Sequence, residues 1–414
     1  MKRYDSRPAN RNRPRQEKPG HIILSCFLAG IPPRTELQAR TLLKRGVPVL
    51  LLAWAGNTSG RDIPEAQYIE ITTPVGSSAR SVGLRRPAVI LEYFEFLLRS
   101  SICLLCRATP GVGIQVSHPL QLPLTPLLRR RGARVYYDVF EFYQATFSSQ
   151  GRLGRVAASA CSWLEARYVP AVDGVLCVTS QESWLKNRMT SLNPRTIELA
   201  NYPSTVESAL KRGAKPRRRL PTGVIAYVGG LKHGKGLEVF AEVMRRVVDV
   251  LPGARFLIVG TIAAPGGAEV WLSTADPEHR CTYVPWTSPS NVQQLLSGAD
   301  VGLVLTQPDD PRHHLVAAGN GRKIFTYMAS GVPIVGPNFS PAWALLSERR
   351  LGLQVDTTNA QEIANAVVRL IQDDTMWRYM SQSARKAFER NFNWETQEQK
   401  LLTLYGIVDE PNWT

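Results

Sequence analysis

Short apolar runs alternate along the chain with segments that show helical periodicity. Each apolar run is bounded by glycine, proline or polar residues, which predicts a buried strand. In the first half, strands are predicted at residues 21–27, 47–54, 113–117, 133–138 and 174–178. Helices are predicted there at residues 34–45, 88–99, 119–131, 153–168 and 181–189. This alternation predicts an α/β fold with a parallel, doubly wound sheet.

A second block with the same alternation follows residues 201–222, which carry prolines and a basic run and are predicted to be an interdomain linker. Its strands are predicted at residues 224–228, 255–259, 281–284, 301–305, 333–335 and 353–355, and its helices at 237–250, 361–372, 376–389 and 395–405. We therefore expect a basic disordered tail at 1–19, Rossmann-like domains at 20–200 and 223–385, and C-terminal crossover helices at 386–414. Two such domains predict a cleft lined by the carboxyl ends of their strands.

The net charge of +16 changes this picture, because it is concentrated in short segments. Residues 1–20 hold seven Lys or Arg against two acids, and residues 211–219 hold six Lys or Arg with no acid. Such clusters suit an anionic membrane surface, an anionic substrate or nucleic acid. Nucleic-acid binding usually adds stacking aromatics, and these segments contain only Tyr4. A membrane or anionic substrate is therefore favoured, with a merely solvating tail as the simplest alternative.

The cysteines and the lengths of the apolar runs indicate the cellular compartment in which the protein is expected. Cys103 and Cys106 form a single CxxC, and no second pair with zinc-ligand spacing accompanies it. A buried pair of thiols on a helix is the favoured interpretation. The basic N-terminus lacks the pattern of a signal peptide, and the longest apolar run, 47–55, is too short to span a bilayer. We expect a cytoplasmic protein with reduced cysteines, peripheral on the inner face of the plasma membrane if the basic clusters bind lipid.

The segment 319–335 is the most informative for chemistry. It reads G-N-G-R-K-I-F-T-Y-M-A-S-G-V-P-I-V, which predicts a loop, a short helix, a glycine stop and a buried strand. Arg322 and Lys323 fall where the helix begins, and a helix N-terminus suits a phosphate because its N–H groups are free. The alternative is an ordinary βα unit with a solvated basic end.

A glycine-rich loop follows the strand predicted at 224–228. Gly229, Gly234 and Lys235 match the first part of a P-loop, but Gly236 stands where magnesium binding needs Ser or Thr. The next strand ends in a glycine rather than an acid, which argues against an ordinary P-loop NTPase. The loop with Lys235 is still a candidate phosphate cradle, and the alternative is a stiff turn with a solvated lysine.

Together these motifs resemble the GT-B glycosyltransferases of the large group 1 (GT4-like) class, over roughly residues 21–408. The segment 323–335 is similar to the family's K-[IL]-F-E-Y-M-A-x-G-x-P-V-[IV] pattern, and 227–236 (Y-V-G-G-L-K-H-G-K-G) to its Y-x-G-x-L…K-G loop. The segment 135–141 (V-Y-Y-D-V-F-E) is similar to its V-x-Y-D-x-H-E strand end, and His118 lies upstream where the family carries a strand ending in His.

The resemblance implies two Rossmann-like domains facing a cleft, with the C-terminal helices packing back on the first domain. It implies sugar transfer from a nucleotide-sugar donor on the second domain to an acceptor on the first, usually with retention and without a metal or other cofactor. Lys235 would contact the donor diphosphate, where charge builds in the transition state, and Lys323 could do the same. Donor contacts are implied at Gly229, Gly230, Lys235, Arg322, Lys323 and Thr326.

Further site residues are implied in the first domain. His118 would face the reacting sugar, and the alternative is a satisfied histidine at a strand end. A glycine loop around Gly30 would let backbone approach the diphosphate or the acceptor. Asp138 and Glu141 either form a carboxylate pair facing the cleft, or cap a helix or pair with Arg134; both interpretations stay open.

The chain departs from the family pattern at the donor site. Thr326 and Ala318 replace the two glutamates of the family's E-x7-E, Gly230 stands where many members carry Arg, and Phe140 replaces a histidine. A threonine hydroxyl would hold ribose more weakly than a carboxylate. The predicted function is sugar transfer to a lipid-linked or polysaccharide acceptor in cell-envelope glycan synthesis, at an anionic membrane and with no nucleic-acid partner. The alternative is a non-catalytic GT-B protein that acts as partner or scaffold of another glycosyltransferase.

Overall fold

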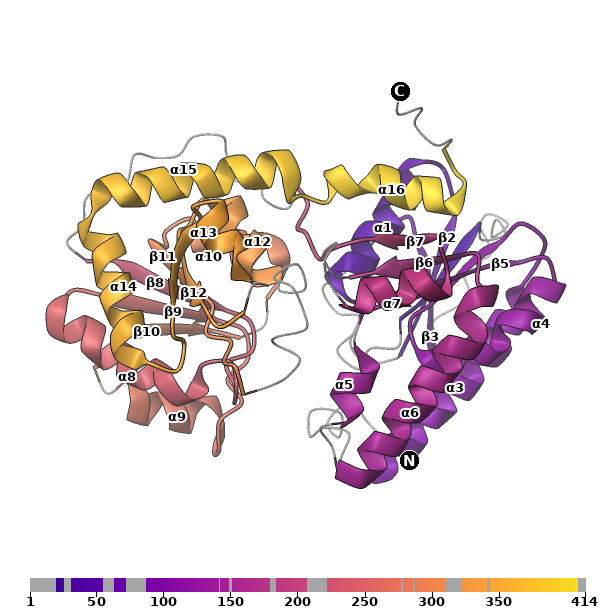
Figure 1. Ribbon diagram of the computed structural model, residues 1–414, viewed down its shortest axis with the longest axis horizontal. Helices are drawn as coiled ribbons and strands as arrows, with labels where there is room; N and C mark the ends of the chain where they lie inside the picture. The colour runs from indigo at the N-terminus through magenta and orange to yellow at the C-terminus, as the bar shows by residue number, and fades with distance from the viewer. Residues whose placement is uncertain are drawn as a thin grey trace, which may run out of the picture.

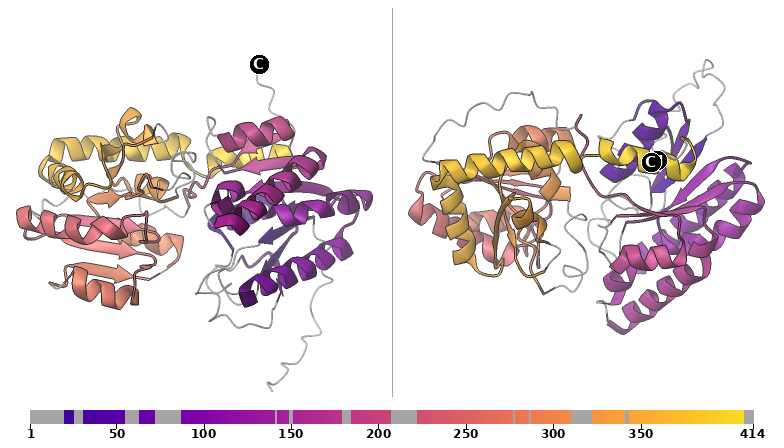
Figure 2. Two further views of the ribbon diagram at one scale, coloured as in Figure 1. Left: turned by 60° about the horizontal axis from the view of Figure 1, so that its bottom comes forward. Right: turned by 45° about the horizontal axis from the view of Figure 1, so that its top comes forward.

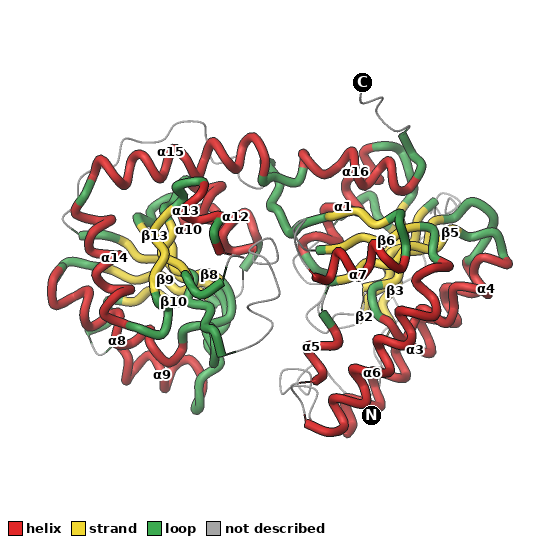
Figure 3. Tube along the Cα trace, in the orientation of Figure 1, coloured by secondary structure: helices red, strands yellow, loops and turns green. Residues whose placement is uncertain are grey.

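Two parallel sheets, each surrounded by helices, form two lobes in this computed structural model (Figure 1). Figure 3 shows the strands at the centre of each lobe with the helices around them. The predicted tail at 1–19, the basic run at 211–219, Gly30 and Glu141 lie outside the described residues. The structure describes residues 20–25, 31–54, 63–71, 87–140, 142–148, 151–178, 184–206, 222–276, 278–285, 287–309, 322–340 and 343–408.

The first sheet has parallel strands in the order β3-β2-β1-β4-β5-β6-β7. Its strands are β1 His21–Ser25, β2 Val49–Trp54, β3 Gln67–Ile71, β4 Gly113–Val116, β5 Arg134–Val139, β6 Gly174–Cys177 and β7 Thr196–Glu198. The chain order reverses between β1 and β4, which pair with His21 opposite Gly113. In open α/β sheets ligands bind at such a reversal, beyond the carboxyl ends of the strands.

Alternate side chains of β5 show which helices cover each face of this sheet. Tyr137 points to one face, where its hydroxyl donates to the Glu165 carboxylate at 3.0 Å, and Tyr136 points to the other, against the ring of Tyr405. The Tyr137 face carries α3 Pro87–Arg107, the 3-10 helix η1 Pro119–Leu124, α4 Thr125–Arg130, α6 Gly151–Tyr168 and α7 Trp184–Leu192. The Tyr136 face carries α1 Pro33–Lys44 and α16 Glu395–Tyr405.

The second sheet is also parallel, in the order β10-β9-β8-β11-β12-β13, and its chain order reverses between β8 and β11. Its strands are β8 Val224–Val228, β9 Arg255–Val259, β10 Cys281–Val284, β11 Val301–Leu303, β12 Ile334–Pro337 and β13 Gly352–Val355. One face packs against α8 Leu237–Val250 and α14 Ala360–Gln372. The other packs against α10 Pro289–Leu296, α12 Arg322–Ser330, α13 Leu345–Glu348 and α15 Asp374–Asn391. The predicted pair of doubly wound sheets is therefore confirmed.

The C-terminal helices connect the two lobes (Figure 2). Helix α15 is continuous through residue 385, where a domain boundary is predicted, and α16 then lies on the first lobe. The Trp394 indole donates to the Thr41 hydroxyl at 2.9 Å, and the Gln397 amide exchanges two hydrogen bonds with the backbone of Ala200. The backbone N–H of Trp394 donates to the Pro203 carbonyl at 3.0 Å, which joins the two places where the chain crosses between lobes. The predicted return of the C-terminal helices to the first lobe is confirmed.

Candidate functional site

Lys323 lies beside the glycine loop at the reversal point of the second sheet. It is the second residue of α12, and its ammonium donates to the Tyr227 hydroxyl at 3.1 Å and lies 4.3 Å from the centre of the Tyr227 ring. A Cβ built on Gly229, where the loop begins, would lie 3.5 Å from Lys323 Cε and 3.7 Å from Nζ. The sequence-predicted helix start and glycine loop therefore come together, as the pattern of two carboxyl-end segments suggests.

Tyr327 holds α12 in this position. Its hydroxyl accepts the Val228 N–H at 2.9 Å and lies 3.1 Å from the carbonyl oxygens of Ala226 and Leu303, to which it can donate. These partners belong to β8 or to β11, so a single buried hydroxyl ties the helix across the two strands at the reversal point. Gly302 makes room for the ring, since a Cβ there would lie 2.7 Å from it. Lys323 lies one turn before Tyr327 on the same helix, so these bonds also fix the position of Lys323.

Tyr227, in strand β8, holds both ends of the glycine loop. Its hydroxyl lies 2.9 Å from the Gly230 carbonyl oxygen and 2.8 Å from the Lys235 carbonyl oxygen, near the two ends of the loop. Gly236 completes the turn into α8 with a φ of 100°, and a Cβ there would lie 2.5 Å from Leu305 Cβ. A residue with a side chain is disfavoured on both counts, which explains why no Ser or Thr follows Lys235.

Positive charge accumulates around Lys323. Burial, the largest cause, and the nearby charges of Lys235 and Lys232 together lower the pKa of Lys323 to about 7. These two ammonium groups make Lys323 harder to protonate, because like charges repel. A bound anion would reverse that effect and stabilise all three charges. The loop is thus an electrostatic site for a phosphate or diphosphate.

Acidic side chains also lie beside the glycine loop. Glu238, in the first turn of α8, accepts the Gly234 N–H at 3.0 Å and contacts Nδ1 of His233, whose Nε2 lies 3.6 Å from an Asp309 carboxylate oxygen. A carboxylate therefore already complements the start of α8. Since an anionic ligand would meet this carboxylate there, the lysine side is the more favourable place for a phosphate.

Thr326 is turned into its own helix. The residue is 7% exposed, and its hydroxyl donates to the Arg322 carbonyl at 2.9 Å. The Thr326 carbonyl accepts from the Gln293 amide at 3.2 Å. Only the lone pairs of the hydroxyl oxygen are left for a ligand, so a ribose bond here would be weaker than one to a carboxylate. Arg322 begins α12, immediately before Lys323.

His118 lies beyond β4, at the reversal point of the first sheet. Its Nδ1 accepts the Leu120 N–H at 3.2 Å, which caps η1, and its ring packs edge-on between Tyr93 and Tyr143 of α5 (Tyr143–Ser148). Burial lowers the pKa of His118 to about 3. The imidazole is therefore neutral with its proton on Nε2, where it can donate to an oxygen but cannot act as a cation. Both interpretations of His118, cap and sugar contact, are compatible with this geometry.

Asp138 does not face a cleft. It is fully buried, forms an ion pair with Arg34, and its Oδ2 accepts from the Gln38 and Gln115 amides at 2.9 Å each. Arg134 instead donates to the Tyr405 carbonyl, so the predicted alternative partner is also wrong. Burial raises the pKa of Asp138, and the Arg34 charge opposes that shift. The residue is structural, and its partner Arg34 could not be identified from local patterns because the two lie 104 residues apart in the chain.

The cysteine pair differs in part from the prediction. Cys103 and Cys106 do lie on helix α3, but Cys106 is exposed and Cys103 is half-buried, and both are free thiols. Within the described residues, no group of three or more His, Cys, Asp or Glu side chains is placed to hold a metal ion. Likewise, none of the described helices is long and apolar enough to cross a membrane.

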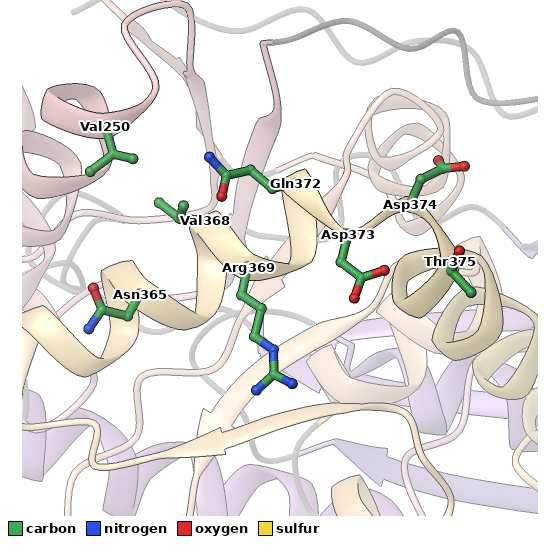
Figure 4. A pocket seen from close by; sticks show the side chains of 8 residues that line it. All are labelled: Val250, Asn365, Val368, Arg369, Gln372, Asp373, Asp374 and Thr375. Atoms are coloured by element: carbon green, nitrogen blue, oxygen red, sulfur yellow. The ribbon is translucent and has the colours of Figure 1, made fainter.

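A surface hollow of about 740 Å³ lies at the other end of the second lobe, where α8 ends and α15 begins (Figure 4). Its acids already have partners: Asp373 caps α15 by accepting the Met376 N–H, and Asp374 pairs with Arg378. The lining also includes Val250, the last residue of α8, whereas the glycine loop precedes the first. This hollow is therefore separate from the lysine site. Its lining residues are Val250, Asn365, Val368, Arg369, Gln372, Asp373, Asp374 and Thr375.

Comparisons with known proteins bear on both lobes. Residues 222–373 match the family model described as Glycosyl transferases group 1. The chain is 22% identical over 261 residues to the putative glycosyltransferase YtcC of Bacillus subtilis, covering 58% of this chain and 62% of that protein. The chain spans less than two thirds of the length of the curated relatives it matches.

Solved structures share the whole architecture. A sucrose-phosphate synthase from Thermosynechococcus elongatus superposes with a TM-score of 0.70 at 17% identity, over 94% of this chain and 99% of that chain. Anabaena HepE, in complex with UDP and glucose, superposes with a TM-score of 0.66 at 12% identity, over 94% and 99% of the two chains. These structures confirm the GT-B fold, and the family model over residues 222–373 confirms the resemblance to group 1 glycosyltransferases.

Proposed function

We propose that this chain, with a group 1 domain in a GT-B fold, is a glycosyltransferase that uses a nucleotide-sugar donor. The carrying observation is the contact of Lys323 with Tyr227 over the glycine loop, beside Lys235 and Lys232. A nucleotide sugar presents a diphosphate, which is the anion that this cluster of ammonium groups suits. The similarity to a protein crystallised with UDP and glucose agrees with a donor of this class.

The lysines would also serve the chemical step. When the sugar–phosphate bond breaks, negative charge builds on the departing diphosphate, and preorganised cations stabilise that charge. Lys323 is held in place by Tyr227, so it loses little freedom on binding. We propose that these ammonium groups, rather than a metal ion, supply the positive charge. Retention of configuration is proposed from the resemblance.

The first lobe would hold the acceptor. His118 is neutral, with its Nε2–H available to donate to a sugar or acceptor hydroxyl beyond β4. We propose a lipid-linked or polysaccharide acceptor of the cell envelope, used by a protein at the cytoplasmic side of an anionic membrane. The net charge of +16 supports the membrane, since it favours binding to anionic lipid.

The non-catalytic alternative is not favoured. The contact between Lys323 and Tyr227 and the glycine turn at Gly236 form a cradle suited to a diphosphate, which favours a donor-binding enzyme over a scaffold. The departure at Thr326 weakens one donor contact and leaves the lysine cluster intact.

A panel of UDP-, GDP- and dTDP-sugars tests the proposal. We expect saturable binding of one nucleoside diphosphate by calorimetry, and slow hydrolysis of its sugar conjugate. Lys235→Ala should lower the rate on the order of 10²-fold. Lys386→Ala, an exposed lysine of α15, is the matched control and should leave the rate unchanged. Absence of both nucleotide binding and donor hydrolysis across the panel would refute the proposal.

A further inference from the structure

The outward side of α3 is apolar, although this helix lies at the surface. Leu91, Phe94, Leu98 and Ile102 follow one another by three or four residues and are 70%, 55%, 62% and 54% exposed. A surface helix normally turns polar side chains to solvent and buries its apolar stripe. Helix α3 buries one stripe and exposes a second, so its outward side is fitted to an apolar environment.

A second exposed apolar stripe lies on α6. Leu153, Val156 and Trp163 are 86%, 67% and 62% exposed. The 3-10 helix η1 packs against both α3 and α6 and carries exposed Leu120, so it links the two stripes on the same face of the sheet. Nine of the 14 exposed large hydrophobic residues in the described part of the chain lie on α3, η1, α4 and α6. We call this area the α3–α6 surface; Figure 1 shows its helices on the outer side of the first lobe.

The charge of this surface is positive. Arg152, Arg155 and Arg167 are exposed on α6, and exposed Arg130 lies at the end of α4. The acids of these elements are not free: Glu92 and Glu165 are buried, and Glu95 pairs with Arg99. Exposed apolar groups bordered by arginines complement an anionic bilayer, where apolar side chains enter the interface and guanidinium groups bind phosphates.

We propose that the α3–α6 surface docks on an anionic lipid bilayer and presents the first lobe to a membrane-held acceptor. The surface begins beside the candidate site, because Tyr93 of α3 packs against His118 while neighbouring Leu91 and Phe94 face outward. A lipid-linked acceptor reaching the protein at this end of α3 would have a short path to His118. This last step rests on the proposed sugar transfer, whereas the docking deepens the proposed membrane binding and does not depend on donor use.

Sedimentation with vesicles tests the docking. The full chain should pellet with vesicles of phosphatidylcholine containing about 30% phosphatidylglycerol, and much less with phosphatidylcholine alone. Phe94→Ser/Leu98→Ser should weaken binding by at least about tenfold, since two apolar side chains leave the interface. The matched control is Val250→Ser/Val270→Ser, which changes two residues of the second lobe that are 55% and 56% exposed, and it should bind like the wild type.

Charge-reversal variants test the docking independently of the apolar side chains. Arg152→Glu/Arg155→Glu should weaken binding by about tenfold or more, because each basic group near an anionic surface adds to the affinity. Arg349→Glu/Arg390→Glu, two exposed arginines of the second lobe, should have a smaller effect. Brominated lipids should quench Trp163, so quenching should be smaller in Trp163→Phe. These two readouts distinguish insertion of α6 from binding by charge alone.

Several outcomes would overturn the inference. Wild-type affinity in both surface variants would mean that the basic tail, or another part of the chain, holds the membrane. Concentration-dependent dimerisation that Phe94→Ser/Leu98→Ser abolishes, without vesicle binding by the wild type, would make the surface a protein interface. Nucleotide binding by the same variants should be unchanged, because none of them touches the lysine site. Vesicle binding without nucleotide binding would refute the proposed function and keep the docking surface.

Discussion

Lys323 and Tyr227, which are 96 residues apart in the chain, meet where strand β8 ends, with the ammonium 3.1 Å from the phenol oxygen. The contact joins the glycine loop to the start of helix α12, two segments that are far apart in the chain. Because Tyr227 also contacts both ends of the loop, a substitution of Lys323 or of Tyr227 should alter the position of the other side chain.

Replacing Lys323 should weaken nucleotide binding. In Lys323→Met the side chain keeps its approximate length and loses the charge, so the diphosphate loses one charge-assisted contact. We expect about a tenfold to hundredfold lower affinity for the nucleoside diphosphate that binds best. Calorimetry measures it, with Lys386→Met as control. Equal affinities in Lys323→Met and the wild type would place the diphosphate elsewhere.

The same lysine predicts a dependence of affinity on pH. Its pKa of about 7 in the free protein should rise when a diphosphate binds, because the bound anion favours the charged form. Below that pKa the lysine is already protonated, and above it binding must take up a proton. Affinity should therefore fall by up to about tenfold per pH unit above roughly pH 7. Lys323→Met should show a flatter profile, and parallel profiles between about pH 7 and 9 would contradict the assignment.

Restoring a P-loop serine at the end of the loop should be harmful. Gly236→Ser places a side chain at a φ of 100° and against Leu305. We expect a loss of about 1–3 kcal/mol in the free energy of unfolding, measured in urea, with no gain of magnesium-dependent NTP hydrolysis. Gly298→Ser, where a Cβ meets no neighbouring atom and φ is not positive, should cost much less. Unchanged stability in Gly236→Ser would mean that the turn has another conformation.

Removing the buried carboxylate of the first lobe should destabilise the protein strongly. Asp138→Ala leaves the Arg34 charge buried without its partner, along with the amides of Gln38 and Gln115. The expected cost is about 3–5 kcal/mol in the free energy of unfolding. Exposed Asp249→Ala is the control and should change it by about 0.5 kcal/mol or less. A small effect of Asp138→Ala would contradict the buried ion pair with Arg34.

The buried strands and the amphipathic helices of both lobes are readable from apolar periodicity alone. Helix α8, for example, is predicted at the same residues as observed, Leu237–Val250, because its apolar stripe faces the sheet. Helix α9 (Gly267–Ala275) was missed because it buries no residue completely, and edge strand β3 because its residues are mostly half-exposed. Local periodicity reports burial, so elements at the margin of the core give little signal.

Side-chain partners are a harder case. Lys323 and Lys235 could be proposed as neighbours, since both follow carboxyl ends of strands in one sheet. The partner of Asp138 could not, because Arg34 lies 104 residues away, and an arginine near a helix start gives no sign that it is buried. The exposed apolar side of α3 was likewise hidden, since an apolar residue in a sequence does not reveal whether it faces core or solvent.

The bond between Trp394 and Pro203 bears on how the lobes could move. The chain crosses between them twice, and Glu395 reinforces the junction by accepting from the Ser204 hydroxyl at 2.6 Å and the Thr205 N–H at 3.0 Å. Because the two crossing segments are hydrogen-bonded to each other, they act as one hinge. Such a hinge permits the lobes to rotate about this region and resists their separation or sliding. The lobes would therefore open and close over a donor by a single rotation centred on this junction.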